Sequence, residues 1–192
     1  MTLTLKIITG STRPGRAGPA VAEWTQAFAR EHGKFDAIEP VDLADVNLPL
    51  LDEAAHPRLH QYQHEHTRRW SSIVDGADAF LFVTPEYDFF PPASLVNAVQ
   101  CLLTEWGYKP AGIVSYGGVS AGLRASQGLR QLLGNVNVHA IPQSLPIPFF
   151  SQFIKDGVFT PNEQTLAGAG LMLDELHRWA GALQPMRQTA AS

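Results

Sequence analysis

The sequence predicts an α/β protein in which a five-stranded parallel sheet lies between two layers of helices. Apolar runs rich in Val, Ile and Phe alternate with segments of helical periodicity along the whole chain. The central run, residues 78–84, is apolar almost throughout, as expected when both faces of a sheet are covered. A chain of 192 residues is the size of one domain, which we expect to span residues 1–192.

The expected elements follow from these runs in chain order. Strands are predicted at residues 3–8, 35–43, 78–84, 111–115 and 137–141. Helices are predicted where apolar residues recur at three- and four-residue spacing, at residues 17–30, 58–74, 93–106, 122–133 and 163–183. Residues 142–161 form an excursion rich in proline and phenylalanine, and residues 184–192 are expected to be frayed. With right-handed crossovers, five such strands suit the order 2-1-3-4-5.

Composition excludes several classes of protein. A net charge of −4 does not favour nucleic-acid binding, and no apolar run approaches the roughly 20 residues of a membrane span. The first six residues have no charged leader, long apolar segment or cleavage site, so we expect a cytoplasmic protein. The single cysteine, Cys101, excludes an internal disulfide, and its apolar surroundings predict a buried, inert thiol.

The loop at residues 10–18 combines the features of an anion site. A strand, a loop of small residues and a helix start follow one another here, so free backbone N–H groups and the helix dipole favour an anion. Ser11 and Thr12 add hydroxyl donors, and Arg13 and Arg16 add guanidinium groups suited to phosphate. The simpler alternative is a helix N-cap within a basic loop. The pattern matches neither the dinucleotide-binding glycine motif nor the P-loop.

A second distinctive loop, residues 85–92, follows the central strand. Pro85 stiffens its start, and such a rigid loop presents backbone groups to a flat heterocycle. Tyr87, Phe89 and Phe90 are candidates for walling that ring; the alternative is that the phenylalanines pack on neighbouring helices or on another subunit. Glu86 and Asp88 are candidates for proton transfer, although two carboxylates in a loop are more simply explained as solvated.

The third loop, residues 115–122, follows the fourth strand. Gly117 and Gly118 allow positive φ or the close approach of a ligand, and their N–H groups are candidates to hold a carbonyl oxygen or ring nitrogen. A plain turn is the alternative. All three loops lie at the carboxyl ends of strands near the point where the winding reverses, which is where ligands bind in such sheets.

The histidines are candidates for a metal site. His56, His60 and His64 are spaced by four residues, with His66 close by, and on a helix imidazoles at this spacing can share a metal ion. Neither a neighbouring cysteine nor an H-E-x-x-H pattern supports this, so we expect a solvated helix face and no metal.

The loops and two further dipeptides together resemble the NADPH-dependent FMN reductase family. The likeness covers about residues 3–183 and is carried by residues 10–16, 84–87, 97–98, 109–110 and 115–118. That family includes flavin-containing quinone, azo and chromate reductases on a flavodoxin-like fold. The resemblance implies FMN as cofactor, NADPH or NADH as electron donor, and a homodimer or homotetramer.

The resemblance also implies where FMN would bind. Ser11, Arg13 and Arg16 would hold the phosphate together with the loop backbone, including Thr12. The isoalloxazine would meet the second and third loops, largely through backbone groups, at Pro85, Glu86, Tyr87, Asp88, Ser115, Tyr116, Gly117 and Gly118. No side chain is expected to be catalytic, because N5 of the flavin carries the chemistry.

Two positions depart from the family pattern. Asp88 stands where the family usually has Asn, and Val96 stands where Lys is common before Asn97. A carboxylate near the flavin would disfavour an anionic reduced ring. Phe89 and Phe90 would narrow the space for nicotinamide or substrate.

The sequence therefore predicts an FMN-dependent NAD(P)H oxidoreductase that passes hydride through FMN N5 to a quinone-like or other small acceptor. The alternative is a non-enzymatic redox sensor or electron carrier, motivated by residues 88–90. A nucleotide transferase lacks support, since neither paired carboxylates nor a P-loop lysine is present. Phe149, Phe150 and Phe153 either cover a partner's flavin edge or cap the chain's own core.

Overall fold

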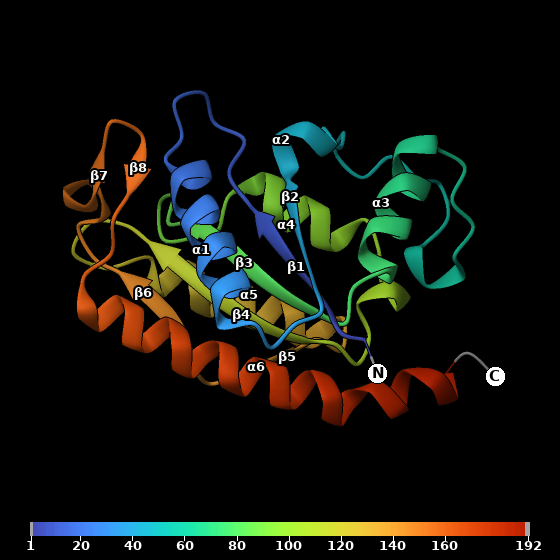
Figure 1. The fold of residues 1–192 in the computed structure, drawn as a ribbon. Helices are drawn as coiled ribbons and strands as arrows, with labels where there is room; N and C mark the ends of the chain where they lie inside the picture. Colours follow the sequence, from blue (N-terminus) through green and yellow to red (C-terminus); the bar gives the residue numbers. More distant parts are fainter. Residues whose placement is uncertain (1, 191–192) are drawn as a thin grey trace.

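The computed structural model describes residues 2–190 and shows a parallel sheet between two layers of helices (Figure 1). The strand order is β2-β1-β3-β4-β5, and every pair along this path is parallel, which confirms the predicted class and order. The strands are β1 (Thr4–Thr9), β2 (Ala37–Asp42), β3 (Ala79–Pro85), β4 (Pro110–Tyr116) and β5 (His139–Ala140). This is the flavodoxin-like order.

The helices divide between the two faces of the sheet (Figure 1). One core contains residues of α1 (Gly18–His32) and α6 (Glu163–Ala190). The other contains residues of α3 (Glu65–Asp75), α4 (Ala93–Gln100) and α5 (Leu123–Asn135). Because both faces are covered, each strand of the centre must be apolar on both sides.

The central strand shows why its sequence has no polar face. Leu81 and Val83 of β3 pack in the core beneath α1 and α6, whereas Phe80 and Phe82 pack in the opposite core against Trp106. All seven residues of β3 are buried. Alternating side chains therefore fill two separate cores from one strand.

The fifth strand position differs from the prediction. β5 has only two residues, and a further strand, β6 (Leu145–Ile147), pairs in parallel with the carboxyl-terminal half of β4. Pro142 lies between them and has no N–H to donate to the ladder. The excursion predicted as irregular also contains η3 (Phe150–Phe153) and a hairpin of β7 (Ile154–Lys155) and β8 (Val158–Phe159).

Two predicted helices are too long. The helix predicted at residues 58–74 begins at Glu65, because Glu53 accepts hydrogen bonds from the N–H groups of Gln63 and His64 and holds residues 60–64 in a loop. A short helix, η1 (Pro57–Leu59), precedes this loop. The helix predicted at residues 93–106 ends at Gln100 and is followed by η2 (Thr104–Trp106).

The prediction of a frayed tail is wrong for residues 184–187. α6 continues to Ala190 with Pro185 inside it, and Arg187 donates hydrogen bonds to Asp78 and to the Tyr108 carbonyl. These contacts hold the last turns against the amino end of the sheet. Residues 191–192 lie outside the described residues.

Two smaller findings concern burial and length. Cys101 is buried, as predicted, and burial raises the pKa of its thiol to about 11. None of the helices within residues 2–190 combines the length and the apolar character that crossing a membrane requires.

Lys109 is a buried cation at the amino end of β4. Its Nζ donates to the carbonyls of Val74 and Asp75, each at 2.9 Å, at the end of α3. Burial lowers the pKa of Lys109 to about 8, although the nearby Asp75 opposes this shift.

We predict that the free energy of unfolding rises between pH 8 and 10.5 because of Lys109. The folded-state pKa lies below the unfolded value, so the unfolded chain binds more protons in this window. The rise is at most about 1.4 kcal/mol per pH unit. Urea unfolding across this range should show it in the wild type and in the surface variant Lys34→Met, and show less of it in Lys109→Met. Equal slopes in all three proteins would contradict the prediction.

Candidate functional site

The three distinctive loops meet at one edge of the sheet. β1, β3 and β4 are neighbours and run parallel, so their carboxyl ends lie together. The Gly10 N–H donates to Val83 at 2.9 Å, and the Glu86 N–H donates to Tyr116 at 3.3 Å. We call residues 10–17, 86–92 and 117–122 the carboxyl-edge loops. Their predicted convergence is confirmed.

Ser11 joins the first and second loops. The residue is fully buried, and its Oγ lies 2.7 Å from the hydroxyl of Tyr87. Thr12 and Arg13 are exposed beside it, and the Arg13 guanidinium lies 5.5 Å from the centroid of the Tyr87 ring. Tyr87 therefore positions this loop from across the sheet edge.

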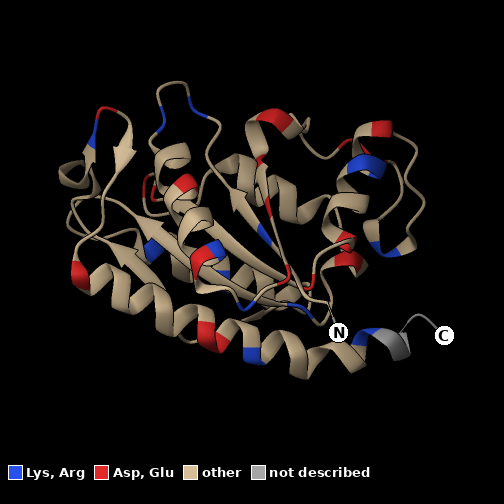
Figure 2. Cartoon of the chain, in the orientation of Figure 1, with Lys and Arg blue, Asp and Glu red and all other residues tan. Residues whose placement is uncertain are grey.

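Arg16 is ion-paired with Asp42, the last residue of β2. The other oxygen of Asp42 accepts the N–H of Ala44 at 2.9 Å and caps α2 (Leu43–Val46). Nε of Arg16 is buried, and among residues 2–190 it has no hydrogen-bond partner. Figure 2 shows basic residues on this loop and acidic residues around α2.

The start of α1 is open to an anion. Within the described chain its N-cap residue, Ala17, makes no side-chain capping bond, and its first turn has no acidic residue. Pro19 in the first turn has no N–H, so the donors here are the remaining free N–H groups of the helix start and the buried Nε of Arg16, which has no partner among the described residues. This arrangement fits a phosphate group, which supplies several acceptor oxygens.

Glu86 is neither solvated nor free, contrary to the simpler reading of its loop. Its side chain is only 6% exposed and accepts hydrogen bonds from Ser120 Oγ at 3.0 Å, and from the backbone N–H and Nε of Arg124 at 3.1 and 2.7 Å. Burial alone would raise the pKa of Glu86, but these donors outweigh it and lower the pKa. The carboxylate caps α5 and ties the second loop to the third.

Residues 87–90 form a tight two-residue turn. Tyr87 and Phe90 exchange two backbone hydrogen bonds of 2.9 Å each, and φ is positive at both Asp88 and Phe89. Asp88, Phe89 and Phe90 are all exposed. The phenylalanines are therefore not part of a helix-packed core.

The side chains at the end of β4 point into the protein. Ser115 Oγ donates to the Ala121 carbonyl at 2.9 Å, and Tyr116 packs edge-on against Phe150 with ring centroids 5.0 Å apart. Both residues are buried, and burial raises the pKa of Tyr116. A ligand at this edge would meet the backbone that follows them.

The expectation that both glycine N–H groups are free is wrong for Gly117. Its N–H donates to Ile147 at 3.3 Å, which ties the loop to β6. Among the described residues the Gly118 N–H has no such partner, and a Cβ built on Gly118 would meet nothing within 4 Å. Gly118 is thus the accessible donor of this loop.

The phenylalanines of the excursion divide between core and surface. Phe150 packs on Tyr116 and Phe153 packs on Phe159, with centroids 6.2 Å apart, so these two cap the chain's own core. Phe149 is 48% exposed. A homodimer or homotetramer stays a prediction.

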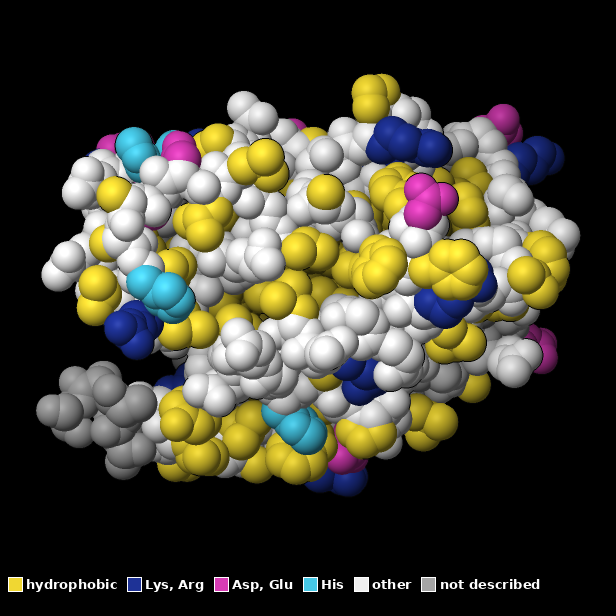
Figure 3. Space-filling view, turned by 180° about the vertical axis from the view of Figure 1, so that it is seen from behind, with side chains coloured by type: hydrophobic (Ala, Val, Ile, Leu, Met, Phe, Trp, Pro, Cys, Tyr) yellow, Lys and Arg dark blue, Asp and Glu magenta, His cyan; other side chains and the backbone are white. Residues whose placement is uncertain are grey.

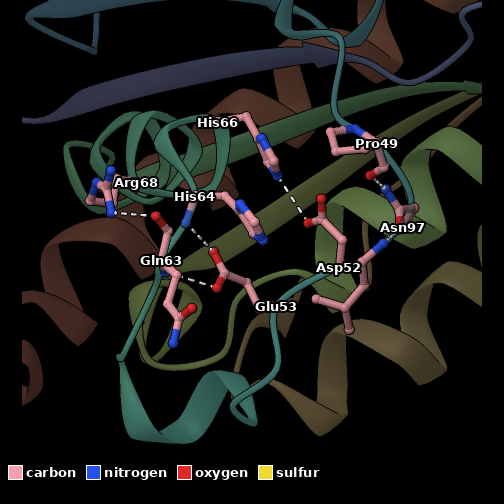
Figure 4. A network of polar contacts seen from close by, with 9 residues as sticks. Pro49, Asp52, Glu53, Gln63, His64, His66, Arg68 and Asn97 are labelled. Atoms are coloured by element: carbon pink, nitrogen blue, oxygen red, sulfur yellow. Dashed lines mark hydrogen bonds and ion pairs between the residues drawn. The ribbon is translucent and has the colours of Figure 1, made fainter.

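Sequence reasoning missed the network that holds the loop after α2 (Figure 4). The Asn97 amide donates to the Pro49 carbonyl at 2.7 Å and accepts the Leu51 N–H at 2.9 Å. Asp52 lies 2.9 Å from Nε2 of His66, which lowers the pKa of Asp52 even though burial opposes this. The one sequence signal for this network was the Asn97–Ala98 dipeptide. The Asn97 side chain bonds to Leu51, 46 residues earlier, and spacing along the chain does not show this contact.

The histidines do not share a helix face. His56 caps η1, and His64 precedes α3, so the four-residue spacing has no helical meaning here. Within residues 2–190 no three His, Cys, Asp or Glu side chains are grouped to hold a metal ion.

Comparison with known proteins agrees with this geometry. The family model for NADPH-dependent FMN reductase matches residues 3–152. An NAD(P)H-dependent FMN reductase of Schizosaccharomyces pombe is 38% identical over 163 residues, which cover 84% of this chain and 80% of that protein. An NAD(P)H:quinone oxidoreductase of Solanum tuberosum is 34% identical over 164 residues, covering 80% and 81%.

A solved structure shares the fold. The flavoenzyme NAD(P)H:(acceptor) oxidoreductase of Paracoccus denitrificans superposes with a TM-score of 0.74 at 22% identity, over 94% of this chain and 98% of that one. This likeness concerns the arrangement of the chain.

We predict that Glu86→Ala lowers the free energy of unfolding by about 1–3 kcal/mol, because it removes the hydrogen bonds that cap the start of α5 and tie the loop to Ser120. Urea unfolding at pH 7 measures this, and the exposed-site variant Glu31→Ala should match the wild type. Since the folded pKa of Glu86 is depressed, its contribution is present above pH 4.5 and is lost as the pH falls through the folded value. A Glu86→Ala protein as stable as Glu31→Ala would refute the capping role.

Proposed function

The chain belongs to the NADPH-dependent FMN reductase family, and from this premise we propose that it carries electrons from NAD(P)H through FMN to a quinone or another small acceptor. With a quinone the reaction balances as NAD(P)H, one proton and quinone giving NAD(P)⁺ and hydroquinone. The convergence of the carboxyl-edge loops carries the proposal, because such an edge is where this fold binds ligands.

The first loop is proposed to hold the FMN phosphate. Arg16 offers a buried Nε without a partner, Arg13 is exposed nearby, and the start of α1 contributes free N–H groups. Together they supply the positive potential and the donors that a phosphate needs. Ser11 contributes by fixing the loop to Tyr87.

The second and third loops are proposed to hold the isoalloxazine. The backbone of the turn at residues 87–90 and the backbone at Gly118 border the same edge, and Glu86 ties the two loops together. FMN, when bound, supplies a ring that accepts hydride at N5 and passes on two electrons. The chain's own part is to bind and orient the reactants, so no side chain is assigned proton transfer.

A specific test compares two flavins that differ only in phosphate. FMN should bind at least about tenfold more tightly than riboflavin, and Arg16→Ala should weaken FMN binding about 10- to 100-fold while leaving riboflavin binding unchanged. Flavin fluorescence titration measures both. Arg30→Ala, at the far end of α1, is the matched control. A wild type that binds neither flavin would refute the proposal.

An electron carrier without enzymatic turnover is the second candidate, because the exposed residues 88–90 offer a docking point at the same edge. Anaerobic NAD(P)H oxidation with a quinone separates the two. We expect kcat above about 1 s⁻¹, which is typical of enzymes. Flavin binding without turnover would favour the carrier.

A further inference from the structure

The turn after β3 places an aromatic residue in an unfavourable backbone conformation. Phe89 has φ +74 and follows Asp88 at φ +46 in a two-residue turn. Turns with positive φ at both positions favour Asn or Asp first and Gly second, because a side chain at the second position is strained. Asp88 fits this preference and Phe89 does not. Strain of this kind concentrates at functional sites.

Phe89 also contacts Arg124 while remaining exposed. The Arg124 guanidinium lies over its ring, 3.9 Å from the centroid, and Nε of Arg124 donates to Glu86 at 2.7 Å. Phe89 is nevertheless 58% exposed. With one face covered by Arg124, the exposed surface includes the opposite face. The ring thus offers a flat apolar surface that is backed by the Arg124 guanidinium.

The Phe89 ring lies on the second of the carboxyl-edge loops, beside the start of α5. Phe89 lies two residues beyond Tyr87, and Arg124 lies in the first turn of α5, four residues beyond Ser120. Figure 3 views the molecule from behind and shows hydrophobic side chains gathered over this layer, with few charged ones at its centre.

The charges near Phe89 favour an uncharged acceptor over NAD(P)H as the molecule that binds there. Beside Phe89 the cation Arg124 is ion-paired with Glu86, and the exposed Asp88 adds a further carboxylate, whereas Arg13 and Arg16 lie on the first loop. A dinucleotide carries several phosphate charges and is not attracted by such surroundings. An uncharged planar ring can bind here, because stacking needs only a flat apolar face.

We propose that the open face of Phe89 is the surface on which a neutral planar acceptor of the quinone class stacks, which makes Phe89 a specificity-determining residue. This rests on the proposed function. Because Arg124 already packs on one face of the ring, stacking on the other face would order few further side-chain groups. The strain of the turn is retained because glycine, although better suited to the backbone, would offer no ring.

Phe89→Gly tests this directly, since it creates the Asp-Gly pair that such a turn favours. The variant should fold, with a melting temperature within about 3 °C of the wild type. KM for a naphthoquinone should rise about 3- to 10-fold, in line with the strength of aromatic pairs. KM for NAD(P)H, KM for the non-planar acceptor ferricyanide and FMN affinity should be unchanged. Calorimetric titration of the oxidised FMN-loaded protein with the naphthoquinone should show the same loss.

Controls separate the ring from its neighbours. Phe89→Tyr keeps a ring and should keep the wild-type KM, whereas Phe89→Leu is apolar but not planar and should resemble Phe89→Gly. Phe90→Ala removes the adjacent ring, which is 67% exposed, and should leave the quinone KM unchanged.

Each failure has a distinct meaning. A wild type that binds FMN but turns over no acceptor refutes the proposed function and this inference with it. A wild type that turns over quinones, with an unchanged quinone KM in Phe89→Gly, overturns the inference alone. An equal rise of the quinone KM in Phe90→Ala also overturns it. So does a sedimentation profile in which Phe89→Gly separates subunits, since the ring would then belong to a contact between copies of the chain.

Discussion

The carboxylate of Glu86 connects the two loops on which the carboxyl-edge site depends. Glu86 directly follows β3. Its carboxylate accepts hydrogen bonds from Ser120, in the loop after β4, and from the start of α5. Parallel strands bring their ends to one edge, but they do not fix the loops that follow. A buried carboxylate with several donors does, because leaving any of them unpaired is costly. The same group also holds Arg124 over Phe89.

The first loop and the other two loops of the site offer different kinds of interaction to a ligand. The first loop offers unpaired donors, namely the start of α1 and Nε of Arg16, and so suits a charged group. The second and third loops have satisfied their side chains internally, as Ser115 and Tyr116 show, and offer backbone and ring surfaces instead. A ligand with a phosphate at one end and a flat ring at the other complements this division.

Much of the fold was predictable because local patterns decide it. The apolar run of β3 and the glycine-rich loop before α1 need no distant partner to be recognised. The features that could not be predicted are those that depend on a residue far along the chain. Glu53 ends the loop before α3, Glu86 finds its donors 34–39 residues later, and Arg16 finds Asp42 after 26 residues. Spacing along the chain does not show such pairs.

The interruption of the last strand has a consequence for the sheet as a whole. β5 and β6 are two and three residues long and are separated by Pro142, so the outer side of β4 is covered in two pieces. An intruding strand from another molecule would find no long, straight row of amide groups to extend. The interrupted edge beside β4 therefore offers a poor template for strand addition, while the centre of the sheet keeps its regular pairing.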